Sequence, residues 1–297
     1  MIRRYIHLLL LPFLLVSCTK YIEFSPPYEG DKIVINGYLS PNEGVRIKIT
    51  HSINPVGKYL RSDSLIVKDA VAALYENGVK LIDLEYTGKG FYGLPDTPAV
   101  ELLAGHKYKL IVQTEQYGKA ESEEITLPAK PEINNFNFEE IGYVYGSGSE
   151  NGLFSFSISK PNEKEACFSI QVVTKDNRSL FFMHYPLIQG RNYFESCGTG
   201  AGGMSIYSNE CGFTNQVHQY SVETKYFENW NISHYYNPLI IRIGTVSRDV
   251  YDYGKSYTQL DGMEFGFAEP PIQKSNIKGG YGLLYGSNTI SFPIELP

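Results

Sequence analysis

The chain has 297 residues, a formal net charge of −6 at pH 7 and an aromatic content of 14%, with 24 Tyr and 16 Phe. The acidic balance argues against a nucleic-acid partner and against electrostatic attachment to anionic lipid, because both would need a cationic surface. The length suits one large domain or two ordinary ones. Short runs of Tyr, Phe, Val, Ile and Thr between Gly, Pro, Asn and Asp are typical of strands, so we expect a mainly β fold.

The N-terminal segment has the layout of a bacterial secretion signal. Two arginines precede an apolar stretch at residues 5–16, which is too short to span a bilayer of about 30 Å as a helix. Residues 15–18 (LVSC) then have the form of a lipobox. Cleavage would leave Cys18 first in the mature chain, and anchoring through more than one lipid chain is stable. We therefore expect residues 1–17 to be a signal peptide and Cys18 to be lipidated.

Residues 18–30 are predicted to form a lipidated tether, because two successive prolines there prevent helix and favour an extended path. A series of short strand-like runs follows, separated by turns: 32–39, 45–50, 67–75, 79–84, 90–94, 105–114 and 119–127. In residues 45–50 every second side chain is apolar, so one face of this strand should be buried. The pair Asn77-Gly78 is a hairpin signal, since both residues tolerate positive φ. This pattern predicts an immunoglobulin-like β-sandwich over residues 31–127.

Two prolines within residues 128–131 indicate a linker, because proline stiffens a connection and interrupts strand pairing. Beyond it, further strand-like runs are longer and less evenly spaced: 136–145, 152–159, 166–174, 180–185, 216–227, 239–246 and 289–294. Residues 192–215 look like a loop. We expect residues 132–297 to form a second antiparallel β domain with one short helix.

The predicted helix begins at Ser247, whose side chain can cap it, and ends near Gly262. Val250, Tyr253 and Tyr257 follow helical spacing. Gly254 lies inside this stretch and should weaken the helix by roughly 1 kcal/mol.

Three cysteines other than Cys18 remain, in a compartment that permits disulfides. Cys197 and Cys211 flank a glycine-rich stretch and are our preferred disulfide pair. Closing a loop of this size would stabilise the fold by about 3 kcal/mol in the chain-entropy model. Cys167 lies in a predicted strand and is expected to act as a small buried hydrophobe.

No catalytic or cofactor motif is convincing. Residues 198–203 match G-x-G-x-x-G, but no helical pattern follows whose N-terminus could meet a pyrophosphate, so we expect no nucleotide. Residues 146–150 fail the nucleophile-elbow pattern at the last position. The pairs at 123–124 and 139–140 are adjacent glutamates, which point to opposite faces of a strand and should be solvated.

The histidines of the mature chain lack metal-ligand spacing, so we expect no metal, although strand ligands need no local spacing and a site built across strands stays open. They are His51, His106, His184, His218 and His234.

The best candidate binding surface is an aromatic cluster within residues 225–237. It holds Tyr226, Trp230, Tyr235 and Tyr236 beside asparagines and a histidine. Aromatic rings next to amides offer flat apolar area with directional hydrogen bonds, as a sugar-binding face or a protein hot spot requires. The alternative is that these rings fill the core of the β domain.

Four motifs resemble a known family. Residues 269–271 (EPP) and 275–284 (SNIKGGYGLL) resemble the ending of a family of Bacteroidota lipoproteins known as domain of unknown function 4249. Residues 247–253 (SRDVYDY) resemble its helix start, and residues 33–38 (IVINGY) with 67–71 (VKDAV) resemble two of its strands. The resemblance implies an envelope lipoprotein, of a kind considered alongside TonB-dependent outer-membrane receptors, and it implies no established activity.

We therefore expect a lipoprotein of the outer membrane, anchored in the membrane by lipid on Cys18, with no cofactor and a non-catalytic binding or accessory role. Expected partners are an outer-membrane barrel receptor, a glycan or a peptide, but no nucleic acid and no nucleotide. The alternative is an envelope hydrolase that acts on glycan or peptide through a site assembled from distant strands. The periplasmic and the surface-facing orientation both stay open.

Overall fold

The fold is known from a computed structural model, which describes most of the chain after the predicted tether. The described residues are 28–54, 60–96, 100–143, 149–159, 167–176, 178–180, 182–184, 198–201, 203–211, 214–228, 232–261 and 273–296.

The N-terminal part consists of short strands and one 3-10 turn, η2 (Ser62–Leu65). The strands are β1 (Ile33–Ser40), β2 (Gly44–His51), β3 (Val71–Glu76), β4 (Val79–Gly88), β5 (Phe91–Gly93), β6 (Lys107–Thr114), β7 (Gly118–Ser122) and β8 (Ile125–Thr126). Asn77 and Gly78 both have positive φ and connect β3 to β4, as the hairpin signal predicts.

The C-terminal part holds longer strands, a second 3-10 turn and one described α-helix. In chain order these are β9 (Ile133–Tyr143), β10 (Ser149–Ile158), β11 (Cys167–Thr174), β12 (Phe182–His184), β13 (Gly198–Ala201), β14 (Met204–Ser208), η3 (Asn209–Cys211), β15 (Val217–Glu228), β16 (Ile232–Tyr235), β17 (Leu239–Val246), α3 (Arg248–Asp261), β18 (Ile277–Lys278) and β19 (Gly280–Ile294).

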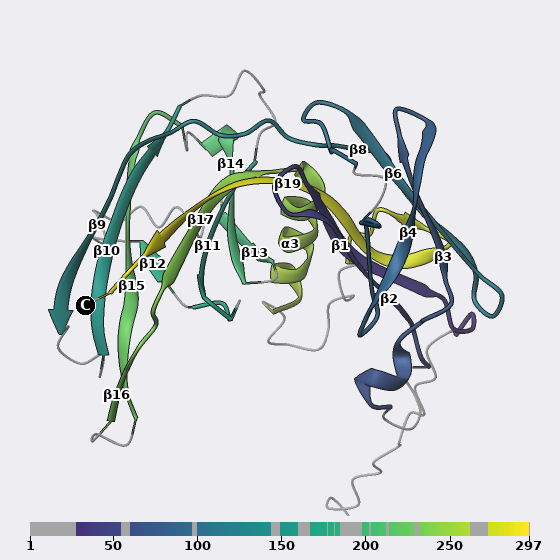
Figure 1. Ribbon diagram of the computed structural model, residues 1–297, viewed down its shortest axis with the longest axis horizontal. Helices are drawn as coiled ribbons and strands as arrows, with labels where there is room; N and C mark the ends of the chain where they lie inside the picture. Colours follow the sequence, from purple (N-terminus) through teal and green to yellow (C-terminus); the bar gives the residue numbers. More distant parts are fainter. Residues whose placement is uncertain are drawn as a thin grey trace, which may run out of the picture. The chain divides into compact units, whose positions relative to one another are not determined.

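The described strands form a 14-stranded sheet and a 5-stranded sheet. The long strand β19 lies in the middle of the larger one, as Figure 1 shows. Its first half pairs in parallel with β1, from Gly280 to Gly286. Its second half pairs antiparallel with β17, from Ser287 to Ile294. A C-terminal strand therefore completes sheet pairing that begins near residue 33.

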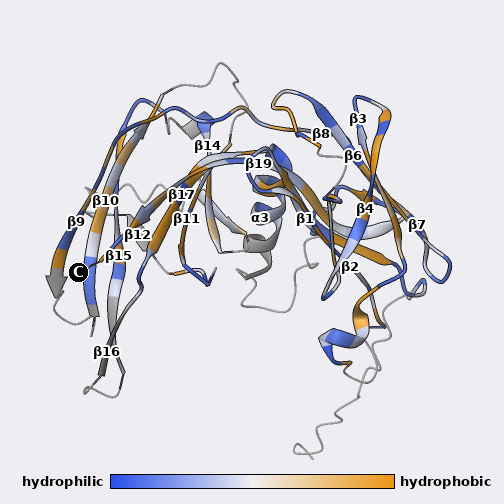
Figure 2. Ribbon diagram, viewed as in Figure 1, coloured by the Kyte–Doolittle hydropathy of each residue, from blue (hydrophilic) through white to orange (hydrophobic). Residues whose placement is uncertain are grey.

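Three clusters of buried apolar side chains lie on these strands. The first joins β1 to β8 and includes Ile35, Ile47 and Leu110. The second lies between the 5-stranded sheet and strands β11 and β17, and the third lies under α3. Along β11, Phe168, Ile170 and Val172 pack in the second cluster and Cys167 packs in the third, and nearly every residue of the strand is buried, so this strand is covered on both faces. Figure 2 shows this hydrophobic character along β11 and β17.

Cys167 shows the consequence of this burial. It lies at the start of β11 in the third cluster and is fully buried. Burial raises the pKa of its thiol to about 12. The expectation that Cys167 acts as a small hydrophobe is confirmed.

The predicted fold class is confirmed: the chain is mainly β, with a sandwich-like architecture and one described helix. The helix expected between Ser247 and Gly262 is observed as Arg248–Asp261. Gly254 has a packing role, since a Cβ atom there would lie 2.8 Å from Thr199 Oγ1 and 3.0 Å from the Gly200 carbonyl oxygen. The helix and β13 therefore approach closely at this glycine.

One prediction is wrong in the C-terminal part. Residues 192–215 were expected to be a loop, but β13 and β14 form a hairpin there, and β14 pairs with β11. Ile206 packs under α3 whereas Tyr207 packs in the second cluster, so the hairpin is held by burial on both faces. The four residues of β13 (GTGA) carry almost no apolar signal, which explains why the sequence did not indicate this strand.

The predicted linker at residues 128–131 is tied to the larger sheet. The Pro128 carbonyl accepts a hydrogen bond from Asn288 Nδ2 at 3.1 Å, and the Ala129 carbonyl accepts one from Thr245 Oγ1. Both donors lie where β19 changes partner from β1 to β17. The division of the chain into domains at this segment stays a prediction.

Candidate binding face

Strands β1, β2, β5 and β19 present a sheet face that lies opposite the first cluster. In β1, Ile33 and Ile35 are buried in that cluster, so the intervening residues point to the other side. The same alternation in β2 buries Val45, Ile47 and Ile49. It leaves Arg46 and Lys48 exposed, and Asn36 of β1 is exposed beside them.

The strand register places these side chains in neighbouring rows. Asn36 pairs with Lys48 on one side, and Lys48 pairs in turn with Phe91. On the other side Asn36 pairs with Leu283, which is buried in the third cluster under α3, so the exposed face ends there. Directly opposed side chains on one face of neighbouring strands lie about 5 Å apart. Residues that are far apart in the chain therefore form one continuous surface.

Cations lie over aromatic rings on this surface. The Arg46 guanidinium carbon is 4.7 Å from the centre of the Phe91 ring, and Lys48 Nζ is 5.8 Å from the same centre. At the neighbouring edge Lys32 Nζ lies 5.6 Å from the centre of the Tyr281 ring, and Tyr281 is 47% exposed. Such contacts are electrostatically attractive and hold long side chains in place. We call this surface the cationic–aromatic face; it consists of Lys32, Asn36, Arg46, Lys48, Phe91 and Tyr281.

A tyrosine pair borders the face. The Tyr38 hydroxyl donates to Glu43 Oε2 at 2.6 Å, and its ring centre lies 5.9 Å from that of Tyr285. Glu43 also lies 3.9 Å from Arg242 Nε. Burial and the contact with Glu43 raise the pKa of Tyr38 to about 12, so this phenol stays protonated at neutral pH.

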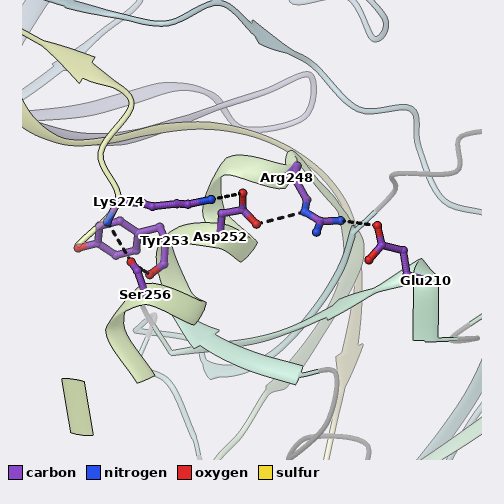
Figure 3. A network of polar contacts seen from close by, with 6 residues as sticks. All are labelled: Glu210, Arg248, Asp252, Tyr253, Ser256 and Lys274. Atoms are coloured by element: carbon purple, nitrogen blue, oxygen red, sulfur yellow. Dashed lines mark hydrogen bonds and ion pairs between the residues drawn. The ribbon is translucent and has the colours of Figure 1, made fainter. Parts of the chain in front are cut away.

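A second group of polar side chains surrounds the start of α3 (Figure 3). Asp252 accepts from Arg248 Nε at 3.2 Å and from Lys274 Nζ at 2.7 Å. Arg248 also donates to Glu210 of η3 at 3.1 Å. Burial acts to raise the pKa of Asp252, but its ion pairs with Lys274 and Arg248 outweigh burial and lower it. Because each charge is matched, we interpret this group as a structural connection between α3, η3 and the segment before β18.

The residues predicted from sequence fall mostly outside the description. Three of them, Cys18, Cys197 and Trp230, lie outside the described residues. For Cys211, Tyr226 and Tyr235 the structure describes the backbone but not the side chain. The backbones of Tyr226 and Tyr235 belong to the hairpin of β15 and β16. Tyr236 is half-buried and packs against the second cluster. Lipidation, the disulfide and the aromatic surface therefore stay predictions.

The other sequence motifs have structural surroundings. Residues 198–201 of the glycine motif belong to the hairpin against α3, where Thr199 is fully buried. Glu139 and Glu140 are exposed on β9, as are Glu123 and Glu124 between β7 and β8. These positions match the expectation of solvated carboxylates.

The histidines with described side chains lie apart from one another. His51 stacks on Tyr117, with ring centres 4.7 Å apart, and His106 lies 3.1 Å from Glu76. His218 is buried beside Phe156. Within the described ranges no three His, Cys, Asp or Glu side chains gather in a way that could hold a metal ion.

Taken together, the fold and the face define a β-sandwich-like protein with a partly exposed surface made of cations and aromatic rings. The sequence profile of a family described as domain of unknown function (DUF4249) matches residues 19–291, so the chain belongs to this family. A comparison with curated proteins finds no match. Of the helices in the described part, none has the length and apolar character needed to cross a membrane.

The cationic–aromatic face was missed from sequence, although part of its signal was visible. The alternation in residues 45–50 already separates Arg46 and Lys48 from the buried side chains. The alternation does not indicate which strands pair with this one. Tyr281 lies on this face only because β19, near the C-terminal end of the chain, pairs with β1.

Proposed function

We propose that this protein is a lipid-anchored lipoprotein of the bacterial outer membrane with a non-catalytic binding role. The observation that carries the proposal is the cationic–aromatic face. Aromatic surface with directional polar groups is the composition of recognition sites, and here the rings and cations lie on paired strands that hold them in register.

The anchor is supported by the N-terminal pattern. The lipobox ends at Cys18, and the family profile begins to match at residue 19, the next residue. A signal peptide directs secretion but is not part of the folded domain, so a profile of the domain would begin to match after it. The proposed source lineage, Bacteroidota, follows from the resemblance of the motifs.

The proposed partner is an outer-membrane barrel receptor of the TonB-dependent kind, with a glycan or a peptide as the carried ligand. A lipid anchor confines the protein to the membrane surface, which raises its effective concentration beside such a receptor.

The test is a mild-detergent pull-down of the C-terminally tagged chain from its own membranes, beside a Cys18→Ser control, with mass spectrometry of the eluted proteins. We expect the wild-type chain to carry acyl mass on Cys18 and to bring down a barrel protein in near-equal amount, while the control loses both. A lipidated chain that elutes alone would contradict the receptor partnership. Turnover of envelope glycans or peptides by the purified chain would favour the hydrolase alternative.

A further inference from the structure

We infer that the cationic–aromatic face binds a short acidic oligosaccharide, one that carries carboxylates on its sugar rings as uronic acids do. This inference rests on the proposed binding role and specifies its ligand.

The charge of the face is opposite to that of the chain. Lys32, Arg46 and Lys48 gather on it, whereas the whole protein has a net charge of −6. In the described part of the chain no carboxylate forms an ion pair with Arg46 or Lys48. The nearest acids by register are Glu85, across Gly93 from Arg46, and Glu43, which already contacts Tyr38 and Arg242. Two cations are thus left to interact with an external anion.

The rings place those cations where a sugar carboxylate would need them. The Arg46 guanidinium carbon and Lys48 Nζ both lie over the Phe91 ring, at 4.7 and 5.8 Å from its centre. Phe91 is partly buried beneath both cations, so a sugar carboxylate reaches them from the solvent side, where the planar guanidinium fork can bind it through two hydrogen bonds. Exposed Asn36 lies in the same row and offers an amide to sugar hydroxyls.

The contacts with rings also reduce the cost of binding. Arginine and lysine side chains each lose up to about 2 kcal/mol of rotamer entropy when they are immobilised. Here ring contacts already restrict Arg46, Lys48 and Lys32 before any ligand arrives. A surface that is ordered in advance binds a small ligand more tightly than a mobile one.

The size of the face favours a small ligand over a protein. Four neighbouring strands span about 14 Å, and the rows from Tyr281 to Tyr285 give about the same length as an upper limit, because Leu283 and Tyr285 pack in the third cluster under α3. The resulting area of about 200 Å² is a quarter of the roughly 800 Å² that each partner contributes to a standard protein interface. A short oligosaccharide fits this area.

The inference is tested by calorimetric titration of the full chain in detergent with tetragalacturonate. The fully methyl-esterified tetramer is the uncharged control, and poly-L-glutamate is the control for a polyanion without sugar. We expect tetragalacturonate to bind, with affinity that falls as salt is added, and both controls to bind at least tenfold more weakly.

Variants locate the binding. Arg46→Gln with Lys48→Gln should weaken tetragalacturonate binding at least tenfold, and Phe91→Ala should also weaken it. Lys80→Gln with Arg178→Gln removes the same charge away from the face and should leave affinity within about twofold. Unchanged melting temperatures would show that every variant is folded.

Three results would overturn the inference: no binding of tetragalacturonate, equal binding of the acid and its ester or of poly-L-glutamate, or equal weakening by both double variants. Failure here is distinguishable from failure of the proposed function. A chain that brings down a barrel protein but ignores tetragalacturonate retains its binding role and loses only this ligand.

Discussion

Gly254 sets how closely α3 approaches β13. A Cβ atom at this position would meet Thr199 Oγ1 at 2.8 Å and the backbone oxygen of Gly200 at 3.0 Å. The hydroxyl can move, but the backbone oxygen belongs to a paired strand. A residue that is unfavourable inside a helix is thus required by packing against the neighbouring hairpin.

We predict that Gly254→Ala destabilises the fold by about 1–2 kcal/mol, because overpacking outweighs the roughly 1 kcal/mol that alanine gains in helix propensity. Chemical denaturation of the variant measures this change. Lys255→Ala, on the partly exposed side of the same helix, should stay within about 0.5 kcal/mol. Thr199→Ala combined with Gly254→Ala should recover part of the loss. A more stable Gly254→Ala variant would contradict the close approach.

Asp252 makes a pH-dependent contribution to stability. Its ion pairs with Lys274 and Arg248 lower its pKa below the ordinary value of 3.8 in the folded state. A carboxyl group with a lowered folded pKa stabilises the fold above its unfolded pKa, and this contribution disappears as pH falls through the folded pKa. The window is therefore the acid limb at and below about pH 4.

We predict that Asp252→Asn lowers the melting temperature at pH 7 and flattens its fall at and below about pH 4. Glu124→Gln, at an exposed carboxylate, serves as the matched control and should keep the wild-type slope. An acid limb that is the same for Asp252→Asn and wild type would show that the ion pairs in Figure 3 contribute nothing to stability.

At the scale of elements, Asn276 attaches the segment before β18 to β19. Its Nδ2 donates to the Leu284 carbonyl at 2.7 Å, and its Oδ1 accepts from the Leu284 amide at 3.0 Å. The side chain is 5% exposed, so the two backbone groups depend on it for hydrogen bonding. A side chain here replaces one rung of a β-ladder.

We predict that Asn276→Ala destabilises the protein by about 2–3 kcal/mol, because it leaves a buried donor and a buried acceptor of Leu284 unsatisfied. Equilibrium urea unfolding measures the loss, and Lys278→Ala, at a side chain that is 69% exposed, is the control. A cost below about 0.5 kcal/mol would show that water replaces the amide.

Sequence patterns identified the elements that carry their own signal. The alternation in residues 45–50, the Asn77-Gly78 turn and the helix near Ser247 all match observed elements. Elements without local signal were missed or shortened. β13 consists of small residues, and the run expected at 289–294 begins nine residues earlier because glycines at 280, 282 and 286 hide the first half of β19. Its pairing with β1 is non-local, so no window of sequence contains it.

The candidate site was missed for the same reason: it has no signal that is local in sequence. The predicted aromatic cluster rested on residues close in sequence, whereas the cationic–aromatic face joins Lys32, Arg46, Phe91 and Tyr281 from four segments. Charge and aromatic character were visible for each residue alone. Their proximity follows from register, which single-sequence patterns do not specify when the paired strands are distant in the chain.

At the scale of the whole chain, β19 belongs to two sheet regions with separate apolar clusters. Leu284 packs in the first cluster, whereas Phe292 and Ile294 pack against the second. Loss of this strand would expose both clusters to water at once. The two regions should therefore unfold cooperatively.

We predict a single unfolding transition by calorimetry and by circular dichroism. Ile35→Val in the first cluster and Ile243→Val in the second should each shift that single transition, because each lowers the free energy of unfolding by about 1 kcal/mol. Two transitions, each shifted by only one of the variants, would contradict cooperative unfolding through β19.

We propose that the cationic–aromatic face is the surface through which this protein binds its ligand in the cell envelope. The most direct test is hydroxyl-radical footprinting of the chain in native envelopes and after purification in detergent. We predict that Phe91 and Tyr281 are modified less in envelopes than in the purified chain, while Tyr86, which is 38% exposed on β4, reacts equally in both. Equal modification of Phe91 and Tyr281 in the two states would contradict the claim.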